Sequence, residues 1–328
     1  MKIAFFDTHQ FEKNLFQALA EKAGHSIHFF DHRLTAQTAL SARGSDCVCA
    51  FVNDRLDEPT LRTLAQEKVR LIALRSAGFN HVNLKVAQEL KMTVVRVPEY
   101  SPYAVAEHAV ALLLALNRKI HKAYNRVREG NFSLEGLTGF DLHQKTVGVI
   151  GTGRIGTAFV NIMLGFGCRV LAFDKAPNSN LAEKGVKYVS LLELLKASDV
   201  VSLHIPLNDQ TRHMIAANEF AAMKPNALLI NTSRGALVET KALIQALKKS
   251  KIAGAGLDVY EEEEGVFFED LSGTVLQDDT LARLLTFPNV LLTSHQGFLT
   301  QEALMNIAQT TIENISQFER GGVLSNQV

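Results

Sequence analysis

A strand pattern that runs into three glycines, G-x-G-x-x-G, and then into a helix pattern constrains the fold of this chain most. The segment covers residues 146–156 and contains Gly151, Gly153 and Gly156. Gly151 permits a tight turn, Gly153 lets the backbone approach a pyrophosphate, and Gly156 lets helix and strand pack closely. The N-terminus of the following helix presents free N–H groups to phosphates. The segment therefore predicts a dinucleotide site in a doubly wound α/β sheet.

The next predicted strand, residues 170–173, indicates which dinucleotide this is. It ends in Asp174, a carboxylate that can accept hydrogen bonds from the ribose diol of NAD and that repels the 2′-phosphate of NADP. Lys175 follows and brings a cation that could tolerate a phosphate, but the neighbouring carboxylate still favours NAD over NADP. We therefore expect NAD as the cofactor, and we expect no metal ion.

Two sets of short β-rich runs alternate with helical patterns along the chain. The first set lies at residues 2–6, 26–30, 47–51, 71–74 and 93–97. The second set lies at residues 146–150, 169–173, 200–203, 227–231, 252–257 and 290–293. Alternation of this kind is typical of α/β domains with parallel sheets, so the chain is predicted to contain two doubly wound parallel-sheet domains.

A domain boundary is predicted after the first set of strands. Ser101 as a helix cap and Pro102 in the first turn predict a long helix that runs to about Tyr124. A closing helix pattern over residues 300–318 has an apolar face that can pack back on the first domain. The expected domains are a split one, residues 1–100 plus 299–328, and a second one, residues 101–298.

Composition excludes several classes of protein. The 34 Lys and Arg residues balance 34 Asp and Glu residues, so the chain has no net field that attracts nucleic acid or anionic lipid. Its 3 cysteines cannot build a disulfide framework, which fits a reducing compartment. No signal-peptide pattern occurs, and the longest apolar stretch is far below the roughly 20 residues that span a bilayer. We expect a cytoplasmic protein that acts on a small molecule and binds neither nucleic acid nor membranes.

Three further segments carry a resemblance to a known family. They read N-T-S-R-G-A-L-V at residues 231–238, G-L-D-V-Y-E-E-E at residues 256–263 and P-N-V-L-L-T-S-H at residues 288–295. With L-R-S-A-G-F-N at residues 74–80 and the segment 97–108, the chain resembles the D-2-hydroxyacid dehydrogenase family over nearly its whole length. The resemblance implies a flavodoxin-like substrate domain, a Rossmann NAD domain and an active site in the cleft between them.

Two stretches, residues 131–139 and 267–279, resemble one branch of this family, the fermentative D-lactate dehydrogenases of Gram-negative bacteria. This resemblance implies reversible hydride transfer between NADH and pyruvate, which gives D-lactate and NAD⁺. Two alternatives stay open. The chain could act on hydroxypyruvate, phosphoglycerate or a branched 2-keto acid, or it could be a non-enzymatic NAD-sensing regulator.

Hydride transfer to a 2-keto acid needs a cation for the carboxylate, a proton donor for the alkoxide and a partner for that donor. Arg234 and His295 each follow a predicted strand end, where open α/β sheets bind ligands. The planar fork of Arg234 suits a carboxylate, and His295 can donate or accept a proton. Glu263 lies in a run of four glutamates, a pattern usually found on solvated surfaces. The resemblance selects it, because the family places the glutamate five residues after the aspartate of Gly-Leu-Asp.

The resemblance also implies binding residues around this catalytic set. Cofactor contacts beyond the three glycines and Asp174 are expected for Arg154, Ile155, Ile205, Pro206, Thr211, Thr232, Ser233 and Asp258. The substrate carboxylate is expected to meet the backbone N–H groups of Ala77 and Gly78 as well as Arg234. The positions that line the space around a methyl group in the lactate branch are Phe51, Tyr100 and Phe298.

The helix predicted over residues 101–124 is expected to lie at a subunit contact, because the corresponding helix of the family packs against its partner's copy. Its apolar residues exceed what one sheet face needs to cover; they are Val105, Leu112, Leu113, Leu116 and Ile120. We therefore expect a homo-oligomer, either a dimer or a tetramer.

Overall fold

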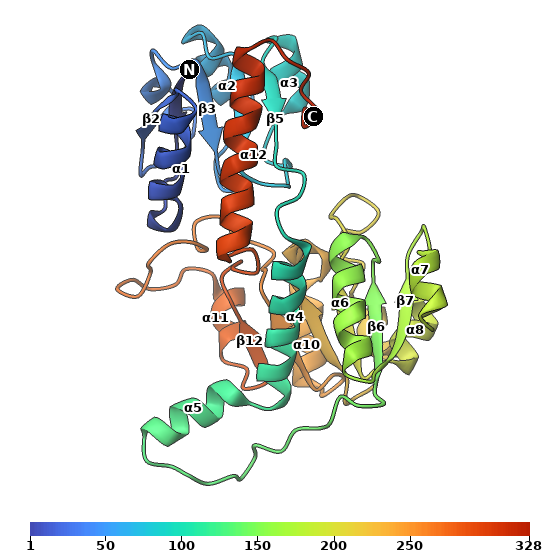
Figure 1. The fold of residues 1–328 in the computed structure, drawn as a ribbon. Coiled ribbons are helices and arrows are strands. Elements are labelled where there is room, and N and C mark those ends of the chain that lie inside the picture. Colours follow the sequence, from blue (N-terminus) through green and yellow to red (C-terminus); the bar gives the residue numbers. More distant parts are fainter. The chain divides into compact units, whose positions relative to one another are not determined.

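The computed structural model describes all residues, 1–328, and they form two compact units (Figure 1). Unit 1 comprises Met1–Ser101 and Leu299–Val328, and unit 2 comprises Pro102–Phe298. Each unit contains one parallel sheet with its own buried hydrophobic core. The predicted fold class, α/β with two doubly wound parallel sheets, is confirmed.

Unit 1 is built on five parallel strands: β1 (Lys2–Phe5), β2 (Ser26–Phe29), β3 (Cys47–Ala50), β4 (Leu71–Leu74) and β5 (Thr93–Val95). Their order in the sheet is β2-β1-β3-β4-β5, which is the flavodoxin-like order. Every residue of β3 and β4 is buried, because helices cover both faces of such a sheet. The helical segments in the first part of this unit are α1 (Gln10–Lys22), η1 (Ala39–Ala42), α2 (Glu58–Gln66) and α3 (Leu84–Glu89).

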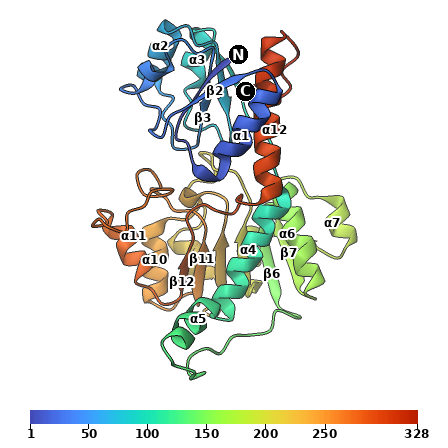
Figure 2. The same cartoon turned by 60° about the vertical axis from the view of Figure 1, so that its left-hand side comes forward.

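The last helix, α12 (Gln301–Glu319), belongs to unit 1 although it follows unit 2 in the sequence. The hydroxyl of Thr300 caps it by accepting a hydrogen bond from the N–H of Ala303 at 3.2 Å. The helix packs against α1 and β4, and both ribbon views show it beside α1 (Figures 1 and 2). The chain then returns to the sheet, where the N–H of Val328 donates to the carbonyl of Val94 at 3.1 Å. The two ends of the sequence therefore share one core.

Unit 2 is built on seven parallel strands: β6 (Thr146–Ile150), β7 (Arg169–Phe173), β8 (Lys187–Tyr188), β9 (Val200–Leu203), β10 (Leu228–Asn231), β11 (Gly254–Leu257) and β12 (Val290–Leu292). Their order is β12-β11-β10-β9-β6-β7-β8. The winding direction reverses between β6 and β9, the place where doubly wound sheets bind ligands. The strand β8 was not predicted from the sequence; it contains two residues and exists through its pairing with β7.

The remaining helical segments of unit 2 are α4 (Pro102–Asn117), α5 (Ile120–Arg128), α6 (Arg154–Gly165), α7 (Ser179–Glu183), α8 (Leu191–Ala197), α9 (Ala217–Ala222), η2 (Gly235–Leu237), α10 (Thr240–Lys248) and α11 (Asp279–Leu285). No helix of the structure combines the length and the apolar character that crossing a membrane requires.

The prediction of one long helix over residues 101–124 is wrong, because the structure has two helices there. The first, α4, begins at Pro102 as predicted but ends at Asn117. The side chain of Asn117 donates to the carbonyl of Phe140 at 2.7 Å and accepts from the N–H of Phe140 at 2.9 Å. Lys119 then adopts a left-handed backbone, with φ of 52°, before α5 begins. The apolar spacing continues from Leu116 to Ile120, so periodicity alone could not locate this break.

The apolar surface expected on the same helix is also corrected by the structure. Val105, Leu112, Leu113 and Leu116 are buried inside unit 2. The helix that carries them, α4, packs against α6, β10 and β11. Only Ile120 of the expected set is exposed, and it lies on α5.

Candidate active site

The glycine-rich turn joins β6 to α6 at the point where the sheet reverses direction. Gly151 has φ of 95°, and a Cβ there would collide with the carbonyl oxygen of His204 after β9. A Cβ at Gly156 would collide with the carbonyl oxygen of Gly151. At Gly153, by contrast, a Cβ would meet no atom within 4 Å. The backbone is therefore tightly packed below the turn and open at the residue expected to approach the pyrophosphate.

Asp174 follows β7, the strand next to β6. Its Oδ2 accepts hydrogen bonds from the N–H of Thr152 at 2.6 Å and from the Thr152 hydroxyl at 2.9 Å, and its Oδ1 accepts from the N–H of Ala176 at 2.9 Å. Partial burial acts to raise the pKa of Asp174, but the hydrogen bonds from Ala176 and Thr152 outweigh it and lower the pKa. Lys175 turns away to donate to the side chain of Gln210. The residue expected at the ribose is therefore a fixed carboxylate.

The loops after β9 and β10 contain the other residues expected at the cofactor. The Thr211 hydroxyl donates to the carbonyl of Pro206 at 2.7 Å and so closes the loop that begins with Ile205. The Ser233 hydroxyl donates to the carbonyl of Leu203 at 2.8 Å and joins the two loops. The Thr232 hydroxyl oxygen is buried without a hydrogen-bond partner. An unpaired buried hydroxyl is uncommon, and it fits a site that receives a polar ligand.

Arg234 lies three residues beyond the end of β10, in a turn held by backbone contacts. The side chain of Asn231 donates to the carbonyl of Arg234 at 2.9 Å, and a guanidinium N–H of Arg234 donates to the carbonyl of Ser233 at 2.6 Å. A Cβ at Gly235 would overlap the carbonyl of Tyr260, so this turn packs directly against the backbone that follows β11. The position of Arg234 is therefore tied to the segment that carries Glu263.

The structure brings His295 and Glu263 together. Nδ1 of His295 lies 2.7 Å from Oε2 of Glu263, and Oε1 of Glu263 accepts from the N–H of Tyr260 at 3.0 Å. Both side chains are about one-fifth exposed, at 21% and 18%. Because the carboxylate occupies Nδ1, the imidazole keeps Nε2 for a reacting group. This is the geometry of a general acid with a partner that orients it.

The other glutamates of the acidic run differ from Glu263 in their surroundings. Oε1 of Glu261 lies 2.5 Å from Nε2 of His213, and its Oε2 accepts from the N–H of Thr240 at 3.2 Å. Glu262 and Glu264 are exposed. Among these four glutamates, Glu263 is the one that contacts His295.

Asp258 holds the loop that carries His295. Its Oδ1 accepts from the Thr293 hydroxyl at 2.6 Å and from the N–H of Gln296 at 2.9 Å, and its Oδ2 accepts from the N–H of Gly297 at 2.8 Å. Nε2 of His108 on α4 also lies 3.1 Å from Oδ1. Burial acts to raise the pKa of Asp258, but the His108 and Thr293 hydrogen bonds outweigh it and lower the pKa. Asp258 is only 1% exposed, and its contact with the cofactor stays a prediction.

His295 itself has a left-handed backbone, with φ of 50°. Its N–H donates to the carbonyl of Asp258 at 2.7 Å, and this bond holds the residue in a conformation that side-chain-bearing residues rarely adopt. The ring of Phe268 lies beside the imidazole with 6.1 Å between centroids. Sequence reasoning missed Phe268 because it lies in a long loop without periodicity.

The substrate residues expected in unit 1 lie after strand ends of its sheet. Phe51 follows β3, is 4% exposed, and lies under the guanidinium of Arg75 at 4.6 Å. Ala77 and Gly78 form a turn after β4 in which Arg96 donates to the carbonyl of Ala77 at 2.7 Å and Ser76 donates to the carbonyl of Gly78 at 2.7 Å. Both carbonyls are thereby engaged within unit 1, and the two N–H groups remain as donors of the turn.

The two remaining substrate residues lie at the ends of the units. Tyr100 is the penultimate residue of the first segment of unit 1, and its carbonyl accepts from the side chain of Asn306 on α12 at 2.6 Å. Phe298 is the last residue of unit 2. Their contribution to a substrate pocket stays a prediction.

Comparison with known proteins identifies the family of this chain. The family described as "D-isomer specific 2-hydroxyacid dehydrogenase, NAD binding domain" matches residues 110–297. The D-lactate dehydrogenase of Escherichia coli (strain K12) is 50% identical over 328 residues, which are 100% of both chains. The chain belongs to the D-2-hydroxyacid dehydrogenase family.

Solved structures of D-2-hydroxyacid dehydrogenases have the same fold. The apo-structure of D-lactate dehydrogenase from Escherichia coli matches with a TM-score of 0.92 and 48% identity, over 100% of both chains. The structure of D-lactate dehydrogenase with NAD⁺ from Lactobacillus jensenii matches with a TM-score of 0.83 and 34% identity, over 100% of this chain and 99% of that one. The protein is an NAD-dependent D-2-hydroxyacid dehydrogenase.

The cofactor of this dehydrogenase family fits the residues of unit 2. The open space at Gly153, the Asp174 carboxylate and the unpaired Thr232 hydroxyl follow the carboxyl ends of β6, β7 and β10, which lie in one parallel sheet. The glycine turn and the first turn of α6, with Arg154 and Ile155, would hold the pyrophosphate, and Asp174 would hold the ribose.

His204, which follows β9 and whose carbonyl lies against Gly151, gives this dehydrogenase a predicted pH dependence of stability. Nε2 of His204 lies 2.8 Å from the Ser202 hydroxyl, and Nδ1 is buried without a partner. Burial lowers the pKa of His204 from 6.5 to about 3. The folded state therefore binds fewer protons than the unfolded state between about pH 6.5 and 3, and the free energy of unfolding falls as the pH falls through that window. The slope from this residue is at most about 1.4 kcal/mol per pH unit.

We expect His204→Gln to flatten this dependence, because glutamine does not take up a proton. The measurement is the thermal unfolding midpoint between pH 7 and pH 5. The exposed His32→Gln serves as the control and should keep the slope of the parent protein. Equal slopes in the parent and His204→Gln would contradict the prediction.

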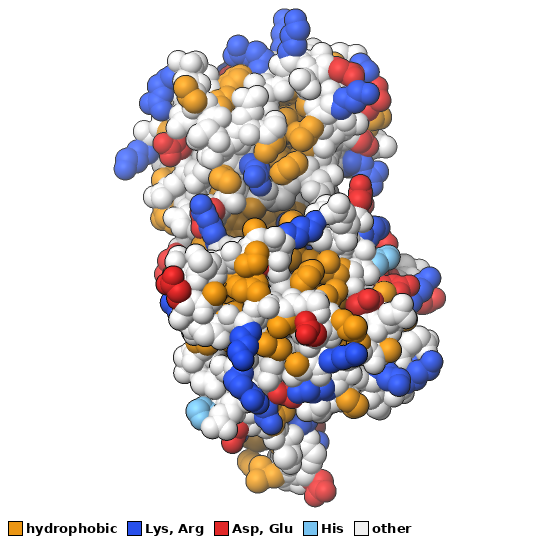
Figure 3. Space-filling model, turned by 90° about the vertical axis from the view of Figure 1, so that its right-hand side faces the viewer, with side chains coloured by type: hydrophobic (Ala, Val, Ile, Leu, Met, Phe, Trp, Pro, Cys, Tyr) orange, Lys and Arg blue, Asp and Glu red, His pale blue; other side chains and the backbone are white.

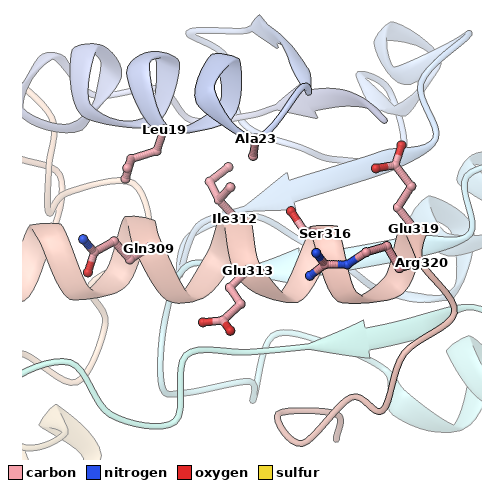
Figure 4. Close-up of a pocket in the computed structure, with 8 residues that line it drawn as sticks. All are labelled: Leu19, Ala23, Gln309, Ile312, Glu313, Ser316, Glu319 and Arg320. Carbon is pink, nitrogen blue, oxygen red and sulfur yellow. The ribbon is translucent and has the colours of Figure 1, made fainter.

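A groove in unit 1 contains none of the predicted site residues of the dehydrogenase. It has a volume of about 370 Å³ and lies between α1 and α12 (Figure 4). Its lining residues are Leu19, Ala23, Gln309, Ile312, Glu313, Ser316, Glu319 and Arg320. They combine apolar, acidic and basic side chains without an unpaired buried donor or acceptor, so we assign the groove no function.

Proposed function

We propose that the protein is a D-lactate dehydrogenase that reduces pyruvate with NADH and oxidises D-lactate in the reverse direction. The observation that carries this proposal is the 2.7 Å contact between His295 and Glu263, in the same unit as the glycine-rich cofactor turn. The choice of lactate is supported by the Escherichia coli relative, which is named D-lactate dehydrogenase.

The roles of the residues follow from their chemistry. The nicotinamide of bound NADH supplies the hydride. Arg234 binds the carboxylate of the 2-keto acid through its planar guanidinium, which matches a carboxylate in two parallel hydrogen bonds. His295 donates the proton from Nε2 to the developing alkoxide and takes a proton from lactate in the reverse direction. Glu263 keeps the Nδ1 proton in place and balances the positive charge of the imidazolium.

Residues of unit 1 contribute to substrate choice in this proposal. The N–H groups of Ala77 and Gly78 are donors for the substrate carboxylate, since their carbonyls are engaged elsewhere. Phe51 is held by the guanidinium of Arg75 on one side and by the His9 ring at 5.3 Å on another. A clamped aromatic ring leaves room for a methyl group and disfavours bulky or phosphorylated substrates.

Steady-state rates of NADH oxidation across a 2-keto acid series test the proposal. The series contains pyruvate, hydroxypyruvate and a branched 2-keto acid, and the product from pyruvate is assayed by a chiral method. We expect the highest kcat/KM with pyruvate and D-lactate as the product. A higher kcat/KM with another acid would show that this member of the family prefers that 2-keto acid to pyruvate. NADH binding without turnover of any acid would favour the regulator alternative.

We also propose a homo-oligomer, and the supporting surface is α5 with the segment after it. Ile120, Tyr124 and Val127 are 50–59% exposed, and they line a groove of about 560 Å³ together with Arg118, Ala123 and Arg128. Phe132 and Leu134 are more exposed still. Figure 3 shows a further group of hydrophobic side chains on one face of unit 2, bordered by Lys and Arg side chains. Exposed apolar side chains that gather on one surface, bordered by polar groups, are typical of protein–protein contacts.

Light scattering at micromolar concentration should give a mass at least twice the 36.1 kDa of one chain. Tyr124→Glu should shift the mass toward one chain, because a buried unpaired carboxylate is costly at an interface. Glu89→Gln, an exposed position on α3 of unit 1, is the control. A mass near 36.1 kDa for the parent protein would refute the oligomer proposal.

A further inference from the structure

A chain of hydrogen bonds leads from the loop after β7 to the Asp174 carboxylate. The N–H of Asn178 donates to the Tyr188 hydroxyl at 2.9 Å, and the Tyr188 hydroxyl donates to Oγ1 of Thr152 at 3.0 Å. The Thr152 hydroxyl then donates to Oδ2 of Asp174 at 2.9 Å. Thr152 stands between the first two glycines of the turn, and Tyr188 is the last residue of the short strand β8.

Every link of this chain has one possible direction. A backbone N–H can only donate, so the Tyr188 oxygen accepts from Asn178 and gives its own proton to Thr152. An ionised carboxylate can only accept, so Thr152 gives its proton to Asp174. The Thr152 N–H adds a second bond to the same oxygen at 2.6 Å. The proton positions are therefore fixed from Asn178 to Asp174.

The series of hydrogen bonds is also shielded from water at its centre. Thr152 is 5% exposed, and its carbonyl accepts from the Thr157 hydroxyl on α6 at 2.9 Å. Removing a buried partner costs more than removing an exposed one, because the remaining polar group stays unpaired. The carboxylate of Asp174 is thus oriented by buried groups, while it lies itself at the surface of the cofactor site.

We propose that Thr152 and Tyr188 are positioning residues that select NADH over NADPH by fixing the orientation of the Asp174 carboxylate. A carboxylate turns easily about its terminal bond, because that torsion has a broad minimum. If it turned, it would lose alignment with a ribose diol and move away from a 2′-phosphate. A carboxylate that is already fixed binds the ribose diol of NADH without a further loss of entropy. It also stays close enough to repel the 2′-phosphate of NADPH.

The test is the ratio of the dissociation constants of NADPH and NADH, measured by isothermal titration calorimetry on the full chain. Thr152→Val removes the hydroxyl and keeps the side-chain shape, so the carboxylate would be held only by backbone N–H groups, such as those of Thr152 and Ala176. We expect the ratio to fall roughly 10-fold, because the carboxylate would then have to be ordered when the ribose diol binds. Thr152→Ser keeps the hydroxyl and should stay within about 2-fold. Tyr188→Phe leaves the Thr152 donor in place, so we expect a smaller fall of roughly 3-fold. Tyr103→Phe, whose side chain is exposed on α4, is the matched control.

A second arm separates positioning from general destabilisation. In an Asp174→Asn background, neither Thr152→Val nor Tyr188→Phe should change the ratio further, because both act through the carboxylate. A folding defect in Thr152→Val would weaken the binding of both cofactors together and lower the thermal unfolding midpoint, and in that case Tyr188→Phe provides the test. An unchanged ratio in Thr152→Val, or an effect that persists in the Asp174→Asn background, overturns the proposal. The inference concerns the cofactor alone, so its failure leaves the D-lactate proposal intact.

Discussion

Replacing Arg234 by lysine is expected to lower kcat/KM for pyruvate by about 100-fold, although the positive charge is kept. A lysine ammonium is a point charge and loses the two parallel hydrogen bonds that a guanidinium makes to a carboxylate. Most of the loss should fall on KM if the carboxylate contact is equally strong in the ground state and the transition state. The turn itself should survive, because Asn231 and Leu237 bond to the backbone carbonyl of residue 234 and not to its side chain.

Arg212→Lys provides the matched control for this prediction. Arg212 is exposed in the loop that follows β9, and its substitution should leave kcat/KM within about 2-fold. If Arg234→Lys turned over pyruvate as well as the parent protein does, Arg234 would have no role in holding the substrate. Equal losses of kcat/KM in both variants would show that the substitutions disturb the loops after β9 and β10, and not a specific contact of Arg234 with the substrate.

Replacing Glu263 by glutamine is expected to lower kcat for pyruvate reduction at neutral pH by about 100-fold or more. Glutamine keeps the size of the side chain but removes the charge that balances the imidazolium and that fixes its proton on Nδ1. KM should change less than kcat, since Glu263 contacts His295, whereas the carboxylate is proposed to bind at Arg234. Steady-state kinetics with saturating NADH measure both constants.

The neighbouring glutamates make this prediction specific. Glu262→Gln removes the same charge from an exposed side chain of the same run and should leave kcat within about 2-fold. A larger loss in Glu262→Gln than in Glu263→Gln would show that Glu263 is not the glutamate on which catalysis depends. Thermal unfolding of both variants distinguishes a catalytic loss from a folding defect.

The fold was largely predictable because its main signals are local. Buried strands such as Leu71–Leu74 are continuous apolar runs, and the glycine turn fixes where the second sheet reverses. The strand β8 was missed because its two residues carry no periodicity and gain their conformation from β7. The break after Asn117 was missed because a hydrogen bond to Phe140, distant in sequence, ends the helix there.

The candidate site was predictable only in part. The contact of Glu263 with His295 was predicted by the spacing that the family resemblance supplied, and the structure contains it. The anchoring of the His295 loop by Asp258 and His108 depends on a helix and two strands that meet only in the folded chain. Likewise, no sequence pattern connects Tyr188 with Thr152, because 36 positions separate them. Hydrogen-bond networks between distant residues carry little signal in a single sequence.

The loop of His295 has a further consequence for hydrogen exchange with solvent. Three successive amides, those of His295, Gln296 and Gly297, donate to one residue, Asp258, through its carbonyl and its two carboxylate oxygens. A rotation of the Asp258 side chain would break the bonds from Gln296 and Gly297 together, and the burial of Asp258, which is 1% exposed, opposes such a rotation. The amide hydrogens of Gln296 and Gly297 should therefore exchange in one cooperative opening event with a shared free energy. The loop that carries His295, the proposed proton donor, is then held or released together with these two amides.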